Sequence, residues 1–114
     1  MSDQPPVIRL DGRDLVADGA FHAVFAKALG FPAFYGNNMS AWVDCMTNLD
    51  DPSAELSEIH VERGHCLTVH IEDAKILKEE APLVWDDLTE CAAFVNWRRI
   101  EMGEPPVLAL AYYV

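Results

Sequence analysis

The stretch Phe31–Asp51, FPAFYGNNMSAWVDCMTNLDD, joins an aromatic loop to an amphipathic helix. On a helix that turns by about 100° per residue, one face carries four large apolar side chains, Met39, Trp42, Val43 and Met46. The opposite arc carries five polar residues, Ser40, Asp44, Thr47, Asn48 and Asp51. Asp44 lies in the middle of this arc, so the sequence predicts a carboxylate presented on a helix that is anchored from behind.

The residues around this helix predict its start and its end. Pro32 stiffens the loop and pushes Phe31 toward an extended conformation. Gly36 is suited to a positive φ angle that turns the loop into the helix, and Asn37 or Asn38 is suited to cap the helix. Asp50–Asp51–Pro52–Ser53 predicts the end, because proline cannot continue the hydrogen-bond ladder.

Three segments outside this stretch predict strands. Val7–Leu10 is short and ends at the turn Asp11–Gly12. Cys66–Ile71 alternates between an apolar and a mixed face. Val107–Val114 is apolar almost throughout, so we expect a central or well-covered strand.

Two further segments have helical spacing. The first contains Phe21 to Leu29, with Asp18 as the expected N-cap and Gly30 as the C-cap glycine. The second runs from Ala74 to about Met102, follows a possible cap at Asp73, and is divided by Pro82. Its predicted core stripe consists of Val84, Leu88, Cys91, Val95 and Met102. Ala54–Gly64 is predicted to connect the central helix to the second strand.

The order of these elements predicts an α/β fold with parallel strands and right-handed crossovers. Arg9, Thr68 and His70 give two strands a mixed second face, which favours a two-layer sandwich with helices on one side. At 114 residues and 51% hydrophobic content, we expect a single domain over residues 1–114.

The net charge of the chain limits the kinds of partner that we expect it to bind. Eight basic and nineteen acidic residues give a net charge of −11, which disfavours nucleic acid and anionic membranes and favours a basic protein partner. No apolar run is long enough to span a bilayer, and the opening residues lack a secretory pattern. Three widely spaced cysteines then predict reduced thiols and a cytoplasmic location.

His60, His65 and His70, together with Cys66, raise the possibility of a metal site. On a strand, Cys66 and His70 share a face, whereas His65 points to the other. Two ligands do not make a site, so we predict neither a metal nor another cofactor.

Catalytic patterns are equally weak. Cys45 lies at the margin of the buried helix face in acidic surroundings, which raise the pKa of a thiol and oppose reactivity. Adjacent carboxylates such as Glu79–Glu80 and Asp86–Asp87 are typical of solvated surface, although a glycosidase-type pair stays open. Phosphate-binding glycine motifs and a GxSxG motif are absent. We predict that the protein is not an enzyme.

The segment FPAFYGNNMSAWVDCMTNL resembles the barstar family of ribonuclease inhibitors. The proline, the Tyr-Gly pair, the second asparagine, the alanine, the tryptophan region and the Asp-Cys pair stand in the family's register. The resemblance is weaker elsewhere but extends over the layout of the whole chain. It implies a three-stranded parallel sheet with helices, no catalytic activity, and one-to-one blockade of an extracellular-type ribonuclease inside the producing cell by a protein that is monomeric when free.

The resemblance also implies roles for individual residues. Asp44 would enter the basic phosphate-binding site of the ribonuclease, Phe34 would stack on its rim, and Gly36 and Asn38 would supply backbone and amide contacts. The implied contact surface also includes Tyr35 and Ser40. Val43, Asn48 and Leu49 would lie at the edge of the interface.

Several positions depart from the family pattern. Ser40 stands where the pattern has a second acid, Phe34 replaces a tyrosine, and Val43 replaces a tryptophan. The acid expected from the last helix has no counterpart around Asn96–Arg99. The partner is therefore either a ribonuclease or another toxin; the competing hypothesis is a non-inhibitory regulatory or scaffold protein that binds a different basic protein.

Overall fold

A three-stranded parallel sheet and four α-helices form the part of the chain that the computed structural model describes, residues 6–114. The elements follow in the order β1 (Val7–Asp11), η1 (Gly12–Leu15), α1 (Ala20–Leu29), α2 (Met39–Thr47), η2 (Pro52–Ala54), β2 (Leu67–Glu72), α3 (Ala74–Glu80), α4 (Pro82–Glu101) and β3 (Leu108–Tyr112), where η marks a 3-10 helix. The predicted order of strands and helices is confirmed, and Pro82 begins α4 as expected.

The strand order in the sheet is β1-β2-β3, and both pairings are parallel. Val7 pairs with Thr68, and Leu67 pairs with Leu108. The sequence predicts a last strand that is either central or well covered; β3 is not central, because β2 is the strand with a neighbour on each side. The apolar character of β3 instead reflects packing on one face: Leu108 is buried, and the ring of Tyr112 contacts that of Trp85 on α4.

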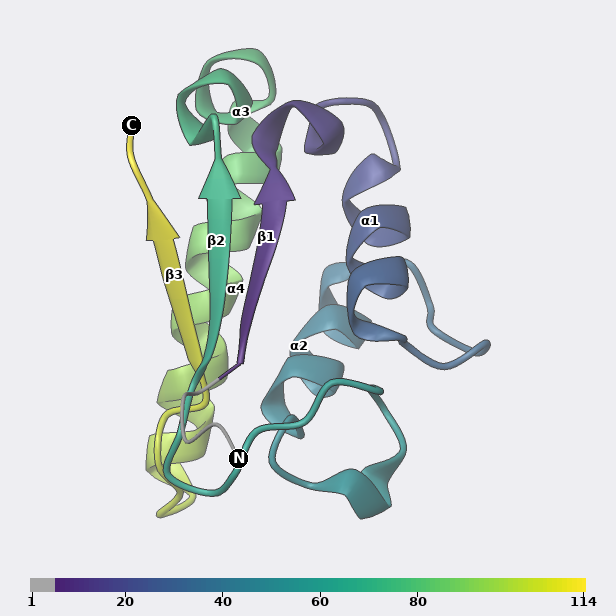
Figure 1. Cartoon of the computed structure of the whole chain (residues 1–114), viewed down its shortest axis with the longest axis vertical. Helices are drawn as coiled ribbons and strands as arrows, with labels where there is room; N and C mark the ends of the chain where they lie inside the picture. Colours follow the sequence, from purple (N-terminus) through teal and green to yellow (C-terminus); the bar gives the residue numbers. More distant parts are fainter. Residues whose placement is uncertain (1–5) are drawn as a thin grey trace.

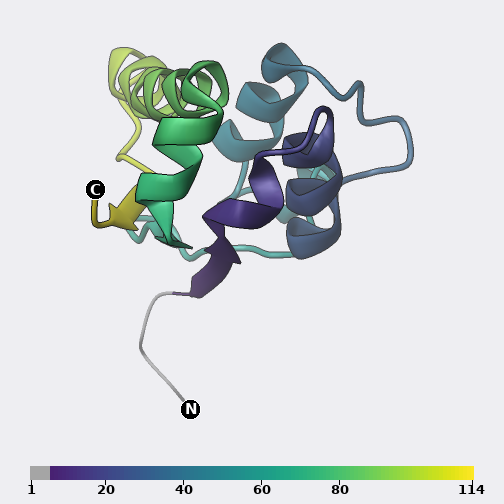
Figure 2. The ribbon, with the colours of Figure 1, turned by 90° about the horizontal axis from the view of Figure 1, so that it is seen from above.

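All four helices lie on one side of the sheet, which confirms the two-layer arrangement (Figures 1 and 2). The β2 side chains that face them, Leu67, Val69 and Ile71, are at most 1% exposed. Thr68 and His70 alternate with these residues and point to the uncovered face, as the period of two requires.

Trp42 of α2 is at the centre of the packing between sheet and helices. Its side chain is fully buried, and its ring lies 5.6 Å from Phe25 and 5.9 Å from Phe21, both on α1. Burial of a large aromatic side chain contributes strongly to stability, so α2 is held from behind, as its apolar face predicts.

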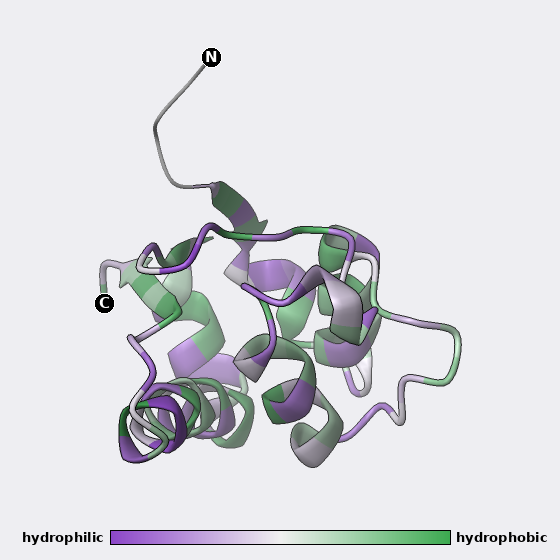
Figure 3. Ribbon diagram, turned by 90° about the horizontal axis from the view of Figure 1, so that it is seen from below, coloured by the Kyte–Doolittle hydropathy of each residue, from purple (hydrophilic) through white to green (hydrophobic). Residues whose placement is uncertain are grey.

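The predicted core stripe of α4 is correct at Leu88 and Val95, which are fully buried. Met102 is 69% exposed because it lies beyond the last residue of the helix. Trp85, Ala92 and Arg99 are buried in addition. Apolar residues also occupy the outer side of the helix, and in the view from below hydrophobic and hydrophilic segments alternate around α4 (Figure 3, lower left).

Two of the expected helix caps differ from the sequence interpretation. Helix α1 starts after Gly19, which has a φ of 77°, and has no side-chain cap from Asp18. Asp73 precedes α3 with a φ of 51° and also makes no side-chain cap; its carboxylate lies 3.5 Å from the guanidinium of Arg13. Gly30 ends α1 in the left-handed conformation, and its N–H donates to the carbonyl of Ala26, as expected.

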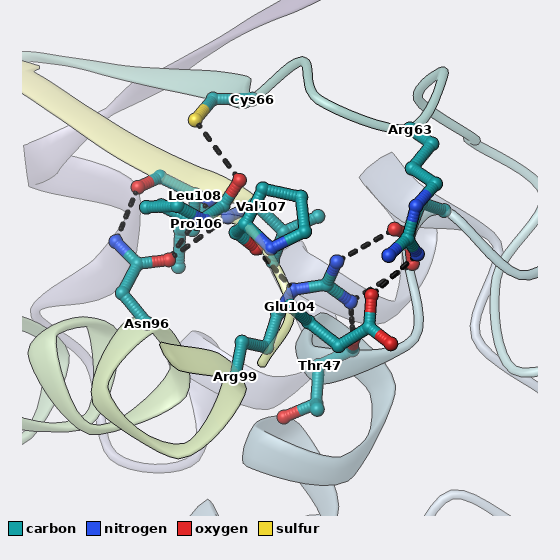
Figure 4. Close-up of polar contacts among 11 residues, drawn as sticks. Thr47, Arg63, Cys66, Asn96, Arg99, Glu104, Pro106, Val107 and Leu108 are labelled. Carbon is teal, nitrogen blue, oxygen red and sulfur yellow. Dashed lines mark hydrogen bonds and ion pairs between the residues drawn. The ribbon is translucent and has the colours of Figure 1, made fainter. Parts of the chain in front are cut away.

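Arg99 ties the end of α2 to the segment that leads into β3 (Figure 4). Its guanidinium donates to both carboxylate oxygens of Asp50, at 2.9 and 2.6 Å, and to the carbonyls of Thr47 and Pro105. Its neighbour Asn96 donates to the Leu108 carbonyl and accepts from the Val107 and Leu108 N–H groups. These polar contacts fix α2 and β3 against α4.

Candidate protein-binding site

The loop between α1 and α2 projects away from the sheet (Figures 1 and 2, right). Phe34 is 77% exposed on this loop. Tyr35 holds the loop in place: its N–H donates to the Pro32 carbonyl at 2.9 Å, its ring lies 4.7 Å from Phe31, and its hydroxyl is 2.6 Å from Nδ1 of His22. The loop therefore presents one free aromatic ring beside an anchored one.

Tyr35 and His22 are both partly buried, and burial acts on their ionisation. It raises the pKa of the Tyr35 hydroxyl and lowers the pKa of His22, so both groups favour their neutral forms. A neutral pair retains the hydrogen bond that joins the loop to α1.

The turn into α2 uses its residues differently from the sequence prediction. Gly36 is not among the residues with positive φ; Asn37 takes this conformation, with a φ of 52°, which asparagine tolerates better than most residues. Asn38 is the N-cap: its side-chain oxygen accepts from the Ala41 N–H at 2.8 Å, and its amide donates to the Gly36 carbonyl. A Cβ on Gly36 would come within 3.1 Å of that amide nitrogen.

Asp44 and Ser40 are exposed on α2, on the arc where the helical periodicity placed them. Asn48 is half-buried and donates to the Asp44 carbonyl at 2.8 Å, which ends the helix. Thr47, predicted on the same arc, is buried, because α4 covers this end of α2 and Arg99 reaches its carbonyl.

Asp44 is not a free carboxylate. Nη1 of Arg98 on α4 donates to Oδ1 of Asp44 at 3.0 Å, while both side chains stay well exposed at 43% and 61%. The pair partly neutralises the charge that the sequence predicted for this surface. Because the two residues are 54 positions apart, only the packing of α4 on α2 brings them together.

Two members of the predicted contact surface are part of the core instead. Leu49 is fully buried and Val43 is 6% exposed. Leu49 follows the C-cap, where the chain turns inward and its carbonyl accepts from the N–H of Val61. Val43 reaches the surface only as the floor of a groove between α2 and α4. Of the predicted set, the structure thus brings together Phe34, Tyr35, Gly36, Asn38, Ser40, Asp44 and Asn48 along one loop and one helix.

The geometry gives no support to a nucleophilic role for Cys45 or to a metal-binding role for the three histidines. Burial, followed by the nearby charge of Asp44, raises the pKa of the Cys45 thiol to about 11, which opposes a nucleophilic role. His60 and His65 are exposed on the connector, and His70 contacts Arg9 on the uncovered sheet face. Within residues 6–114, no three His, Cys, Asp or Glu side chains form a group that could hold a metal ion.

Sequence reasoning missed two residues that shape this surface, His22 and Arg98. No local pattern marks either of them, since each acts on a residue of another element. Phe94 and Trp97, exposed on α4 near Arg98, were missed as well. Both residues fall outside the Leu88–Val95 stripe. Because a helix needs only one apolar face to pack on a core, large apolar residues outside that face are a sequence signal for a second contact surface.

Among the described residues, no helix has both the length and the apolar character needed to cross a membrane. A family model described as "Barstar (barnase inhibitor)" matches residues 6–108 of the chain. No curated protein matches the chain significantly. The parallel three-stranded sheet with its four helices agrees with the barstar fold. The chain therefore belongs to the barstar family, the family of barnase inhibitors.

Proposed function

We propose that this protein inhibits a basic ribonuclease, or a related nuclease toxin, by covering its active site with α2 and the loop before it. The complex is one-to-one, and the free inhibitor is a monomer that acts as one domain in the cytoplasm of the producing cell. The observation that carries the proposal is the exposed Asp44 on an anchored helix that follows the loop bearing the exposed Phe34.

A carboxylate suits this role because nuclease active sites bind phosphate groups through cationic side chains. Asp44 would occupy such a phosphate subsite with charge-assisted hydrogen bonds. Phe34 would add apolar contact at the rim, where aromatic side chains are enriched in protein interfaces. The net charge of −11 would speed encounter with a basic enzyme.

Rigidity supports the same function. The burial of Trp42, the Asn38 cap and the Tyr35–His22 hydrogen bond fix the loop and helix before any partner arrives. A surface that is already ordered loses less conformational entropy on binding, which favours affinity.

The test is a titration of the protein into barnase and a panel of other small basic ribonucleases, with cleavage of a fluorescent RNA as the readout. We expect at least one enzyme to be silenced at a near-equimolar ratio. Asp44→Ala should need a much higher concentration, whereas Asp14→Ala, which removes the same charge from the turn after β1, should act as wild type.

Two results would refute the proposal. One is that none of these ribonucleases binds or is inhibited. The other is that wild type and Asp44→Ala inhibit equally. Binding of a basic protein without nuclease activity, in the absence of any inhibition, would favour the regulatory or scaffold hypothesis instead.

A further inference from the structure

A groove of about 290 Å³ separates the exposed side of α2 from α4. It starts beside the Asp44–Arg98 ion pair and has Val43 as its floor. Its other walls are Met39 and Ser40 of α2 and Cys91 and Phe94 of α4. The groove joins the surface proposed to bind the nuclease to the outer side of α4.

Two stacked aromatic rings continue this surface on α4. The rings of Phe94 and Trp97 lie 5.6 Å apart at an interplanar angle of 28°, and the two residues remain 45% and 56% exposed. The opposite side of α4 is already packed through Leu88 and Val95, so the pair adds little to the core. Exposed aromatic groups of this kind are favoured at protein interfaces, where they often dominate affinity.

The charged pair also has unused hydrogen-bonding capacity. Within the described residues, a single bond joins Nη1 of Arg98 to Oδ1 of Asp44, and the other carboxylate oxygen and guanidinium N–H groups have no bond. Both side chains are exposed, at 43% and 61%, so these groups are open to solvent in the free protein. A partner that covers the pair must replace that water, since a buried polar group without a hydrogen bond is strongly unfavourable.

We propose that Phe94 and Trp97 of α4 supply apolar contact to the partner nuclease across the groove, and that Arg98 recognises one of its carboxylates, where the family pattern has an acid on the last helix instead. This inference rests on the proposed function and adds to it the chemistry of the partner. The partner presents a cation to Asp44 and, beside it, an acidic side chain to Arg98. Arg98 is therefore a specificity determinant that rejects a uniformly cationic surface.

A different role for Arg98 makes the opposite prediction. If Arg98 only masked Asp44, its removal would release a full negative charge and tighten binding to a basic enzyme. If Arg98 contacts a partner carboxylate, its removal leaves that carboxylate without a donor and weakens binding. The sign of the change in affinity distinguishes the two roles.

The experiment measures Kd with barnase, and with whichever ribonuclease of the panel the wild type inhibits, for variants of Arg98, Phe94 and Trp97. We expect Arg98→Ala and Trp97→Ala each to raise Kd by at least about tenfold, with a smaller loss for Phe94→Ala. Arg98→Lys should recover part of the loss, because it keeps the charge without the guanidinium fork.

The controls carry matched changes on the uncovered sheet face and at the chain end. Arg9→Ala removes an exposed arginine from β1, and Tyr113→Ala removes an aromatic side chain that is 90% exposed. Both should bind as wild type. Circular dichroism and urea unfolding confirm that each variant is folded.

The outcomes separate this inference from the proposed function. If Asp44→Ala weakens binding while the α4 variants bind as wild type, the inference fails and the inhibitor function stands. Tighter binding by Arg98→Ala also overturns it, in favour of masking. If wild type binds no ribonuclease, both the function and the inference fail.

Discussion

Two adjacent arginines of α4 allow a direct test of how burial determines the strength of an ion pair. Arg99 pairs with Asp50 and Arg98 pairs with Asp44, at 2.6 and 3.0 Å. The Arg99 and Asp50 side chains are only 6% and 9% exposed, against 43% and 61% for the other pair. We expect Arg99→Leu to be far more destabilising than Arg98→Leu.

The expected magnitudes follow from what each change leaves behind. Arg99→Leu leaves the buried Asp50 carboxylate without its hydrogen-bonded partner and removes the donor to the carbonyls of Thr47 and Pro105. Loss of one partner from a buried pair lowers the free energy of unfolding by about 3–5 kcal/mol. Loss of an exposed pair, as in Arg98→Leu, changes it by about 0–1 kcal/mol.

Urea unfolding followed by tryptophan fluorescence measures both variants. With a dependence of about 2 kcal/mol per M for a domain of this size, the Arg99→Leu midpoint should fall by about 2 M. The Arg98→Leu midpoint should fall by less than about 0.5 M. The double variant Arg99→Leu/Asp50→Leu should lose less stability than the sum of its single changes, because it leaves no buried charge.

Equal midpoints for the two single arginine variants would refute this reasoning, since burial would then not distinguish the pairs. Strict additivity in the double variant would refute the coupling between Arg99 and Asp50.

The remaining predictions concern the core, the site and the dependence on pH. Trp42→Ala should lower the free energy of unfolding by about 3–5 kcal/mol, measured by urea unfolding, because the side chain is fully buried; a loss below about 1 kcal/mol would contradict its central position. Asp44→Ala should change stability by no more than about 0.5 kcal/mol in the same assay. Stopped-flow association of the wild type with a ribonuclease that it inhibits in the proposed titration should slow as salt rises; a rate that does not vary with salt would contradict electrostatic steering. The hydrogen bonds from Arg99 lower the pKa of Asp50. The pair therefore stabilises the protein fully above the ordinary carboxyl pKa of about 4, and this stabilisation is lost as pH falls through the lowered pKa. The free energy of unfolding of Arg99→Leu, measured across acidic pH, should lack that part of the pH dependence. Burial lowers the pKa of His22, so its contribution is complete above the ordinary value of about 6.5 and is lost as pH falls through the lowered one; an NMR titration that places His22 above 6.5 would contradict this.

Much of the fold could be predicted because its elements have local causes. Alternation in Leu67–Ile71 indicates a half-covered strand, Gly30 and Pro82 mark helix boundaries, and the apolar face of α2 indicates which side is buried. The order of these elements then favours parallel pairing. The predicted side-chain caps at Asp18 and Asp73 are absent. Gly19 is the residue that precedes α1, and the Asp73 carboxylate pairs with Arg13, which is far away in the sequence.

The candidate site was predictable where exposure follows helical periodicity, as at Ser40 and Asp44. The site was not predictable where another element buries a residue or forms an ion pair with it. Leu49 and Thr47 are buried by the turn after α2 and by α4, and Asp44 is paired by a residue from 54 positions away.

The sequence alone therefore determined the central helix, its anchored face, its asparagine cap and the carboxylate it presents, because these depend on the spacing of neighbouring residues. The tertiary structure decided that β2 is the central strand, that His22 holds the aromatic loop, and that Arg98 is placed against Asp44. These features depend on contacts between elements far apart in the chain, and periodicity carries no information about such contacts. The net charge around Asp44 depends on the packing of α4 on α2, because only this packing places Arg98 against the carboxylate.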